Sequence, residues 1–171
     1  MKILLIIDML KDFINKNGAL YCGEEARKIV PFIKKKIDEC RASDCKLVYI
    51  CDSHEKDDKE FNMFKSHCIE GTDGAQILDE LKATSQDIVI KKKRYSGFYG
   101  TELARLLKEI EPDVVEVLGV CTSICVMDTV GDLRNRDYRV RVYKDGVADF
   151  DKDAHEFSLK RMKGIYGAEI I

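Results

Sequence analysis

Six short apolar runs, rich in β-branched residues, alternate along the chain with longer segments of helical period. The runs are ILLII at 3–7, KLVYIC at 46–51, DIVIK at 87–91, VVEVLGV at 114–120, RVRVY at 139–143 and AEII at 168–171. This alternation is typical of a mainly parallel sheet covered by helices. We therefore predict an α/β fold in which residues 1–171 form a single domain, with an open, mainly parallel six-stranded sheet and helices on both faces.

The segments between the runs space their apolar residues three and four positions apart, which places one apolar stripe on each helix. The stripes are Ala26, Ile29, Val30, Ile33, Ile37 and Cys40; then, behind a Thr101 cap, Leu103, Leu106, Leu107 and Ile110; then Val126, Met127, Val130 and Leu133; and finally His155, Leu159 and Met162. Neither a repeat nor a linker divides the chain.

One stretch, residues 52–73, has no regular period and at 22 residues is too long for an ordinary connection in a compact α/β domain. Such a loop is usually functional or disordered. It contains two of the three histidines of the chain, which favours a functional loop.

Composition limits the kind of partner. The chain is 45% hydrophobic and 35% charged, which excludes a disordered or low-complexity protein. Its 29 basic and 31 acidic residues give a net charge of -2, too balanced for binding to nucleic acid or to a membrane surface. We expect a small, neutral partner or substrate.

The seven cysteines are odd in number and none forms a C-x-x-C pair, so we interpret them as reduced thiols of a cytosolic protein. The first apolar run ends at Asp8 and is too short for a secretion signal or a membrane span. We therefore expect a cytoplasmic protein.

Three residues that follow predicted strands are candidates for catalysis, because ligands bind beyond the carboxyl ends of parallel strands. Asp8 is either a general base or a helix-capping or turn residue. Lys92 belongs to a basic run that could be only a solvated strand exit, although Tyr95 and Phe98 adjoin it. Cys125 lies in the first turn of a helix if Thr122 or Ser123 caps it, which would lower the pKa of the thiol; the alternative is a packed, inert cysteine.

A possible metal set lies in the long loop. Asp52 and His54 are two positions apart and His67 follows 13 positions later, which offers one carboxylate and two imidazoles. These groups suit zinc, iron or manganese and leave coordination positions for water or substrate. A histidine-bearing surface loop without metal is the alternative.

Several separated segments, in order along nearly the whole chain, resemble the isochorismatase-like cysteine hydrolases and, among them, the nicotinamidase (pyrazinamidase) branch. The segments are IIDMLKDF at 6–13, CDSHEKDDKEF at 51–61, FKSHCIEGTDGA at 64–75, KKRYSGFYGTEL at 92–103, LGVCTSICVMDT at 118–129 and KDGVADFDKDAHEFSLKRM at 144–162. The resemblance implies an isochorismatase-like, Rossmann-like domain.

By position, the resemblance implies that Asp8 is the general base, Lys92 the cationic member of the triad and Cys125 the nucleophile. It also implies a cis peptide bond between Val120 and Cys121, whose amide would help to bind the substrate oxygen together with that of Cys125.

The resemblance further implies that Asp52, His54 and His67 bind a divalent metal, zinc before iron or manganese, and that aromatic side chains surround the substrate ring. Those side chains would be Phe13, Phe64 and Tyr95. The chain departs from the common pattern at three positions: Phe64 replaces Trp, Ser66 stands in a W-P-x-H motif that here lacks its proline, and Ser123 replaces Asp. We expect the first two departures to alter the pocket wall.

These features predict an amidohydrolase that converts nicotinamide to nicotinic acid and ammonia through a cysteine thioester, as in pyridine nucleotide (NAD) salvage. One alternative is a relative that acts on another small amide, a carbamoyl or a ureido compound. A further alternative is an isochorismatase, which the metal set disfavours.

A protein of another class would be a metal-dependent oxygenase or hydrolase in which Cys125 is only structural. A non-enzymatic binding protein with a flavodoxin-like or dinucleotide-binding sheet is disfavoured, because neither of the phosphate-binding motifs G-x-G-x-x-G and G-x-x-x-x-G-K-[ST] is present. Homo-oligomers are frequent among the proteins that the chain resembles, so one is possible here.

Overall fold

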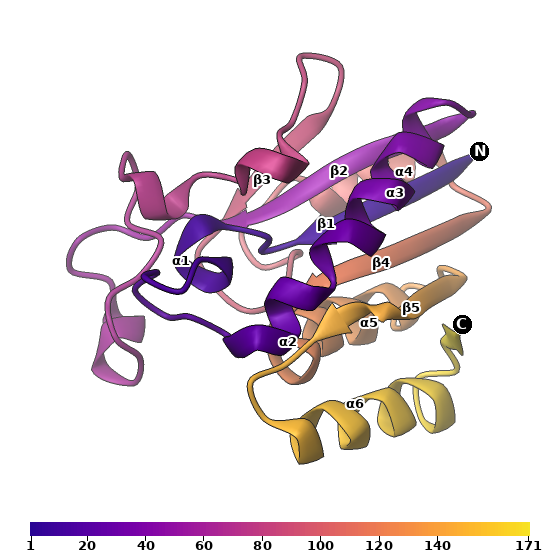
Figure 1. The fold of residues 1–171 in the computed structure, drawn as a ribbon. Coiled ribbons are helices and arrows are strands. Elements are labelled where there is room, and N and C mark those ends of the chain that lie inside the picture. The colour runs from indigo at the N-terminus through magenta and orange to yellow at the C-terminus, as the bar shows by residue number, and fades with distance from the viewer.

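The computed structural model describes residues 1–171 and contains one six-stranded sheet with the order β3-β2-β1-β4-β5-β6 (Figure 1). Every neighbouring pair of strands is parallel. The strands are β1 (Lys2–Ile7), β2 (Cys45–Asp52), β3 (Ile88–Lys92), β4 (Val114–Val120), β5 (Val140–Ala148) and β6 (Glu169–Ile170). The predicted α/β fold is confirmed.

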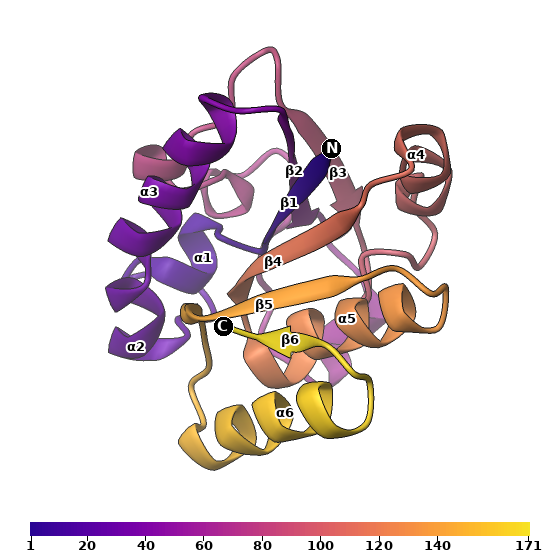
Figure 2. The same ribbon diagram turned by 90° about the vertical axis from the view of Figure 1, so that its right-hand side faces the viewer.

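Helices cover both faces of the sheet (Figure 2). On one face lie α1 (Lys11–Ile14), α2 (Gly23–Lys28) and α3 (Val30–Arg41); on the other lie α4 (Leu103–Ile110), α5 (Met127–Arg134) and α6 (Lys152–Gly164). Successive strand residues point to opposite faces, so Leu4 and Ile6 of β1 pack with the first group, whereas Leu5 and Ile7 pack with the second. None of these helices is long and apolar enough to span a membrane.

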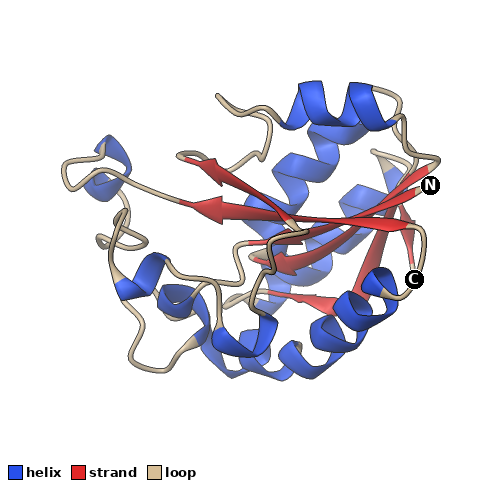
Figure 3. Ribbon diagram, turned by 90° about the horizontal axis from the view of Figure 1, so that it is seen from above, coloured by secondary structure: helices blue, strands red, loops and turns tan.

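The strand order reverses between β1 and β4, and at such a reversal the connections leave in opposite directions and open a crevice. Figure 3 shows the strand arrowheads pointing toward the side where the long loops gather, while both chain termini lie on the other side. The carboxyl ends of β1 to β4 therefore meet at the centre of this edge.

The long loop is ordered by contacts of its own. Its segment after β2 makes a 3-10 turn at Lys59–Asn62, and His54 forms an isolated bridge with Ile69. The Asp12 carboxylate, from α1, accepts hydrogen bonds from the backbone N–H groups of Cys68 at 2.7 Å and of Ala19 at 3.0 Å. Asp12 thus fixes the end of the loop that carries His67.

Two expectations about local structure are wrong. The first apolar stripe lies on two helices, α2 and α3, because the chain turns at Ile29 and Pro31, which lacks an N–H group, stands in the first turn of α3. In addition, Cys40 and Cys45 form a disulfide and are not reduced thiols. The short turn from α3 to β2 brings their Cα atoms to 5.1 Å, within the range that a disulfide spans.

Candidate active site and metal cluster

Asp8 follows β1 in a left-handed conformation (φ 53°), which Asp adopts more readily than most residues. Its buried carboxylate accepts a hydrogen bond from the N–H of Asp52 at 2.9 Å through Oδ1. Burial, helped by the nearby charge of Asp52, raises the pKa of Asp8 to about 6 although Lys92 opposes the shift. Oδ2 lies 2.8 Å from Lys92 Nζ but accepts no well-aligned hydrogen bond, so it keeps a lone pair that can take a proton.

Lys92 is the last residue of β3 and its side chain is fully buried. Its ammonium group contacts Asp8, Asp52 and Cys125, with 3.4 Å between Nζ and Sγ of Cys125. Burial disfavours the charged form, but the two carboxylates outweigh it and raise the pKa of Lys92 well above its usual range. The neighbouring Lys91 and Lys93 are exposed and pair with surface carboxylates, so Lys92 is the lysine that meets the other candidates.

Cys125 lies in a π-helical turn (Thr122–Val126) that precedes α5. Its sulfur and one carboxylate oxygen each of Asp8 and Asp52 all lie within 4.8 Å of one another. The expected lowering of the thiol pKa is wrong. Burial is the main cause of a raised pKa for Cys125, the carboxylates add to it, and Lys92 only partly opposes it. The sulfur therefore keeps its proton until a base removes it, and Asp8 is the base within reach.

The bond between Val120 and Cys121 is cis. Both residues line a cavity of about 270 Å³ that also opens onto Asp8 and Cys125. The predicted ring-contacting residues Phe13, Phe64 and Tyr95 line the same cavity. Ser66, in contrast, is exposed and does not line it, so the expected effect of that departure on the pocket wall is wrong.

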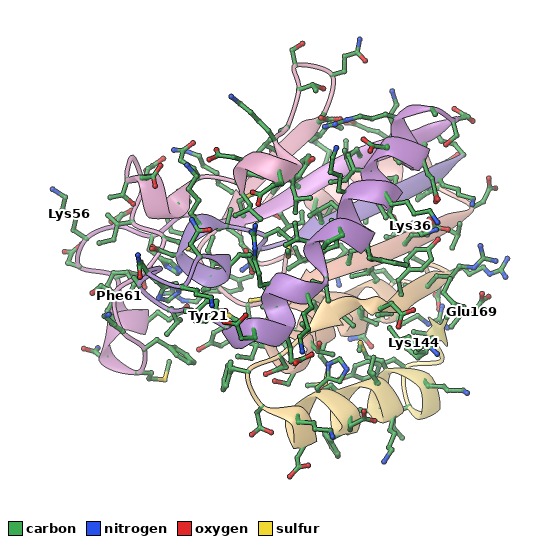
Figure 4. The ribbon with its side chains drawn as sticks, in the orientation of Figure 1. Tyr21, Lys36, Lys56, Phe61, Lys144 and Glu169 are labelled. Atoms are coloured by element: carbon green, nitrogen blue, oxygen red, sulfur yellow. A yellow bond between two sulfur atoms is a disulfide. The ribbon has the colours of Figure 1, made fainter.

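Several other residues of the cavity wall could not be located from the sequence. They are Leu20, Tyr21, Cys22, Ile124 and Phe150. Leu20 to Cys22 come from the segment ahead of α2, and Figure 4 shows Tyr21 on the same side of the molecule as Phe61 of the long loop. Their apolar character indicates a ligand with a flat or apolar body.

Beside the triad, Asp52, His54, Glu60 and His67 form a buried cluster whose ligand atoms all lie within 4.8 Å of one another. Nε2 of His54 is 3.5 Å and Nε2 of His67 3.8 Å from Oδ2 of Asp52. Oε1 of Glu60 lies 3.9 Å from Nε2 of His67. Glu60 was not among the predicted ligands, because nothing in the run of charged residues around it distinguishes this carboxylate from its neighbours.

Contacts around the cluster fix the direction of both imidazoles. Nδ1 of His67 lies 2.7 Å from the carbonyl oxygen of Lys65, which can only accept, so Nδ1 carries the proton. Nδ1 of His54 lies 3.1 Å from the carboxylate of Asp58, which Arg94 in turn holds. Histidines that bind metals are oriented by such partners, which leave Nε2 free to ligate.

The cluster fits a divalent cation by its own chemistry. Nε2 of His54 and Oε2 of Glu60 are buried yet have no hydrogen-bond partner. Buried polar groups are rarely left without partners unless an ion or water meets them. Two imidazole nitrogens and two carboxylates suit zinc, iron or manganese.

The fold and the site together define a hydrolase-like α/β domain with a buried Asp-Lys-Cys group beside a cluster of possible metal ligands. The sequence matches the isochorismatase domain family over residues 2–171. The chain therefore belongs to the isochorismatase family.

Solved structures of several amidases are similar to this chain. The nicotinamidase/pyrazinamidase of Bacillus subtilis has a TM-score of 0.94 and 34% identity, covering 99% of this chain and 98% of that chain. The N-carbamoylsarcosine amidase of Thermoplasma acidophilum has a TM-score of 0.88 and 35% identity, covering 99% and 94%. The pyrazinamidase of Pyrococcus horikoshii, solved in complex with zinc, has a TM-score of 0.93 and 28% identity, covering 99% and 98%.

Proposed function

We propose that this protein is a cysteine-dependent amidohydrolase whose preferred substrate is nicotinamide, which it converts to nicotinic acid and ammonia. The observation that carries the proposal is the position of Lys92, which contacts Asp8 and Cys125 together beside one apolar cavity. A base, a cation and a thiol in mutual contact are the parts that an activated nucleophile needs.

In the proposed reaction, Oδ2 of Asp8 takes the thiol proton and Sγ of Cys125 attacks the amide carbonyl. Lys92 offsets the negative charge that passes between the carboxylate and the sulfur. The tetrahedral intermediate breaks its C–N bond, and the proton held by Asp8 leaves with the ammonia. Asp8 then accepts a proton from a water molecule that attacks the thioester, which releases the acid and restores the thiol.

Asp52, His54, Glu60 and His67 would hold a divalent metal, zinc by preference. When bound, such an ion supplies a Lewis acid that can hold a ring nitrogen of the substrate. The similarity to a pyrazinamidase solved with zinc supports this assignment. Asp52 contacts Lys92 as well as the imidazoles, so its carboxylate connects the ligand cluster to the triad.

The cavity wall supports an aromatic substrate. Phe13, Phe64 and Tyr95 line it from three separate segments, and planar aromatic groups pack well against such rings. The similarity to an N-carbamoylsarcosine amidase keeps a second substrate class, small carbamoyl compounds, in the test.

The test is ammonia release from a panel of amides by zinc-loaded protein, with Cys125→Ala and Cys51→Ala alongside. We expect nicotinamide to be hydrolysed fastest and Cys125→Ala to lose at least about 10⁴-fold in kcat, because the covalent route is gone. Cys51 is also buried but its thiol makes no hydrogen bond to Asp8, Lys92 or Cys125, so Cys51→Ala should keep its activity within about threefold. Substantial turnover by Cys125→Ala would exclude the thioester route; a faster carbamoyl substrate would replace nicotinamide.

A further inference from the structure

Two side chains from outside the triad hold the turn that carries Cys125. Asp149, directly after β5, accepts a hydrogen bond from the N–H of Ser123 at 2.7 Å through Oδ2. His155, in α6, lies with Nδ1 2.9 Å from Oγ1 of Thr122. Both contacts reach the first residues of the π-helical turn: Thr122 lies three positions before Cys125 and Ser123 two positions before it.

These contacts replace the cap that the turn does not make for itself. The first N–H groups of a helix have no acceptor within the helix and need one from elsewhere. The residue before the turn, Cys121, makes no side-chain cap, and neither Thr122 nor Ser123 serves as the predicted cap. Asp149 supplies the missing acceptor, and a carboxylate is favourable at the N-terminal end of a helical segment.

Asp149 is itself held rigidly. Its side chain is buried, and Oδ1 accepts a hydrogen bond from the N–H of Asp151 at 3.2 Å. Asp151 caps α6 by accepting from the N–H of Ala154 at 3.0 Å. The carboxylate therefore joins the nucleophile turn to the beginning of α6, the helix that also carries His155.

We propose that Asp149 and His155 are positioning residues that hold Thr122 and Ser123 and thereby aim Sγ of Cys125 at Lys92 and the cavity. The inference rests on the proposed role of Cys125 as nucleophile. Neither side chain touches the reacting atoms. A displacement of the nucleophile by about 1 Å can cost about 100-fold in rate, so small errors in the turn are sufficient to slow the reaction.

The test compares Asp149→Ala, Asp149→Asn and His155→Leu in zinc-loaded protein. For Asp149→Ala we expect kcat to fall about 10- to 100-fold while KM stays within about threefold, because the cavity wall is unchanged. Asp149→Asn keeps an oxygen that accepts from Ser123 and should retain kcat within about threefold. His155→Leu removes only the contact to Thr122, so a smaller fall in kcat, about three- to tenfold, is expected.

The matched control is Asp145→Ala, since Asp145 is an exposed carboxylate of β5 that makes no hydrogen bond. The alkylation rate of Cys125 by iodoacetamide, measured without substrate, should fall about tenfold in Asp149→Ala and stay unchanged in the control. A role in stability alone would lower the unfolding temperature and leave kcat and the alkylation rate of the folded protein unchanged.

Three results would overturn the inference: wild-type kcat in folded Asp149→Ala and His155→Leu, equal damage by Asp149→Asn and Asp149→Ala, or an unchanged alkylation rate in Asp149→Ala. Failure of the proposed function is a separate result, since wild-type protein would then hydrolyse no amide in the panel. The alkylation measurement still tests the positioning contacts in that case.

Discussion

Among the buried residues, Lys92 is the one lysine, and its ammonium group is surrounded by Asp8, Asp52 and the sulfur of Cys125. A buried charge is tolerated when it is paired and becomes destabilising when its partner is removed. Lys92 is therefore needed for two reasons: it serves the proposed chemistry, and it compensates two carboxylates in an apolar environment.

Glu60 gives a prediction at the level of a single ligand. We expect Glu60→Gln to weaken zinc binding by at least about tenfold, because even the partners of ligands typically change metal affinity 10- to 100-fold. The measurement is zinc titration against a competing chelator. Glu55 is an exposed carboxylate of the same loop, paired with Lys93, so Glu55→Gln should bind zinc like the wild type. Equal affinity of both variants would remove Glu60 from the ligand set.

Single residues differ in how far sequence could locate them. Asp8 and Lys92 stand at the ends of recognisable strands, and Cys125 follows one in the next turn. The ordered motifs distinguished these three residues from others of the same type. Glu60 lies in an acidic run and is distinguished only by the fold of its loop. The raised pKa of Cys125 depends on burial by residues distant in sequence, which helix position alone does not report.

Within β4, Gly119 allows two strands to approach closely. Its φ is +122°, and a Cβ atom there would lie 2.0 Å from the carbonyl oxygen of Ile7 in β1. The register between β4 and β5 also shifts at this point, between Val117 and Gly119. This irregular pairing lies directly before the cis bond and the turn that carries Cys125.

We expect Gly119→Ala to lower the free energy of unfolding by about 3 kcal/mol, through strain and backbone collision. Gly164→Ala is the matched control, because Gly164 ends α6 with open space around it and should change stability by no more than about 1 kcal/mol. Urea denaturation measures both. Equal stability of the two variants would show that the sheet relaxes without cost at Gly119.

At the level of elements, apolar periodicity located all six strands. The fifth was expected over 139–143, whereas β5 extends over Val140–Ala148, because its pairing with β4 resumes after the polar residues Lys144 and Asp145. Such a continuation depends on a neighbouring strand and is not encoded locally. The π-helical turn at Thr122–Val126 was likewise unpredictable, since its cap comes from Asp149.

Across the whole molecule, the end of α3 is joined to the segment before β3 by an ion pair. Arg41 lies 2.5 Å from Asp87, whose carboxylate also accepts from the N–H of Thr84 at 2.7 Å. Burial alone would raise the pKa of Asp87, but the hydrogen bonds from Arg41 and Thr84 outweigh it and lower that pKa. The contact therefore links a helix to an edge of the sheet that is distant in sequence.

A lowered folded-state pKa means that Asp87 stabilises the fold above its unfolded value of about 3.9 and loses this effect as pH falls further. We expect Asp87→Asn to reduce the free energy of unfolding by about 1 to 3 kcal/mol at pH 7. The difference from wild type should shrink as pH falls below about 4, where the unfolded chain binds the proton first, and should reach its minimum only below the lowered folded-state pKa of Asp87. Denaturation curves at several pH values measure this; a difference independent of pH would contradict the ionic contribution.

The candidate site takes some residues from strand ends and others from a loop, and this distribution has a consequence for how such proteins diverge. Asp8 and Lys92 stand at the ends of parallel strands, whereas Phe64 and His67 belong to the long loop. Replacement of loop residues can change which molecule is accepted and leave the proposed catalytic groups at the strand ends in place. One scaffold can in this way give rise to enzymes with distinct substrates that share a single chemical step.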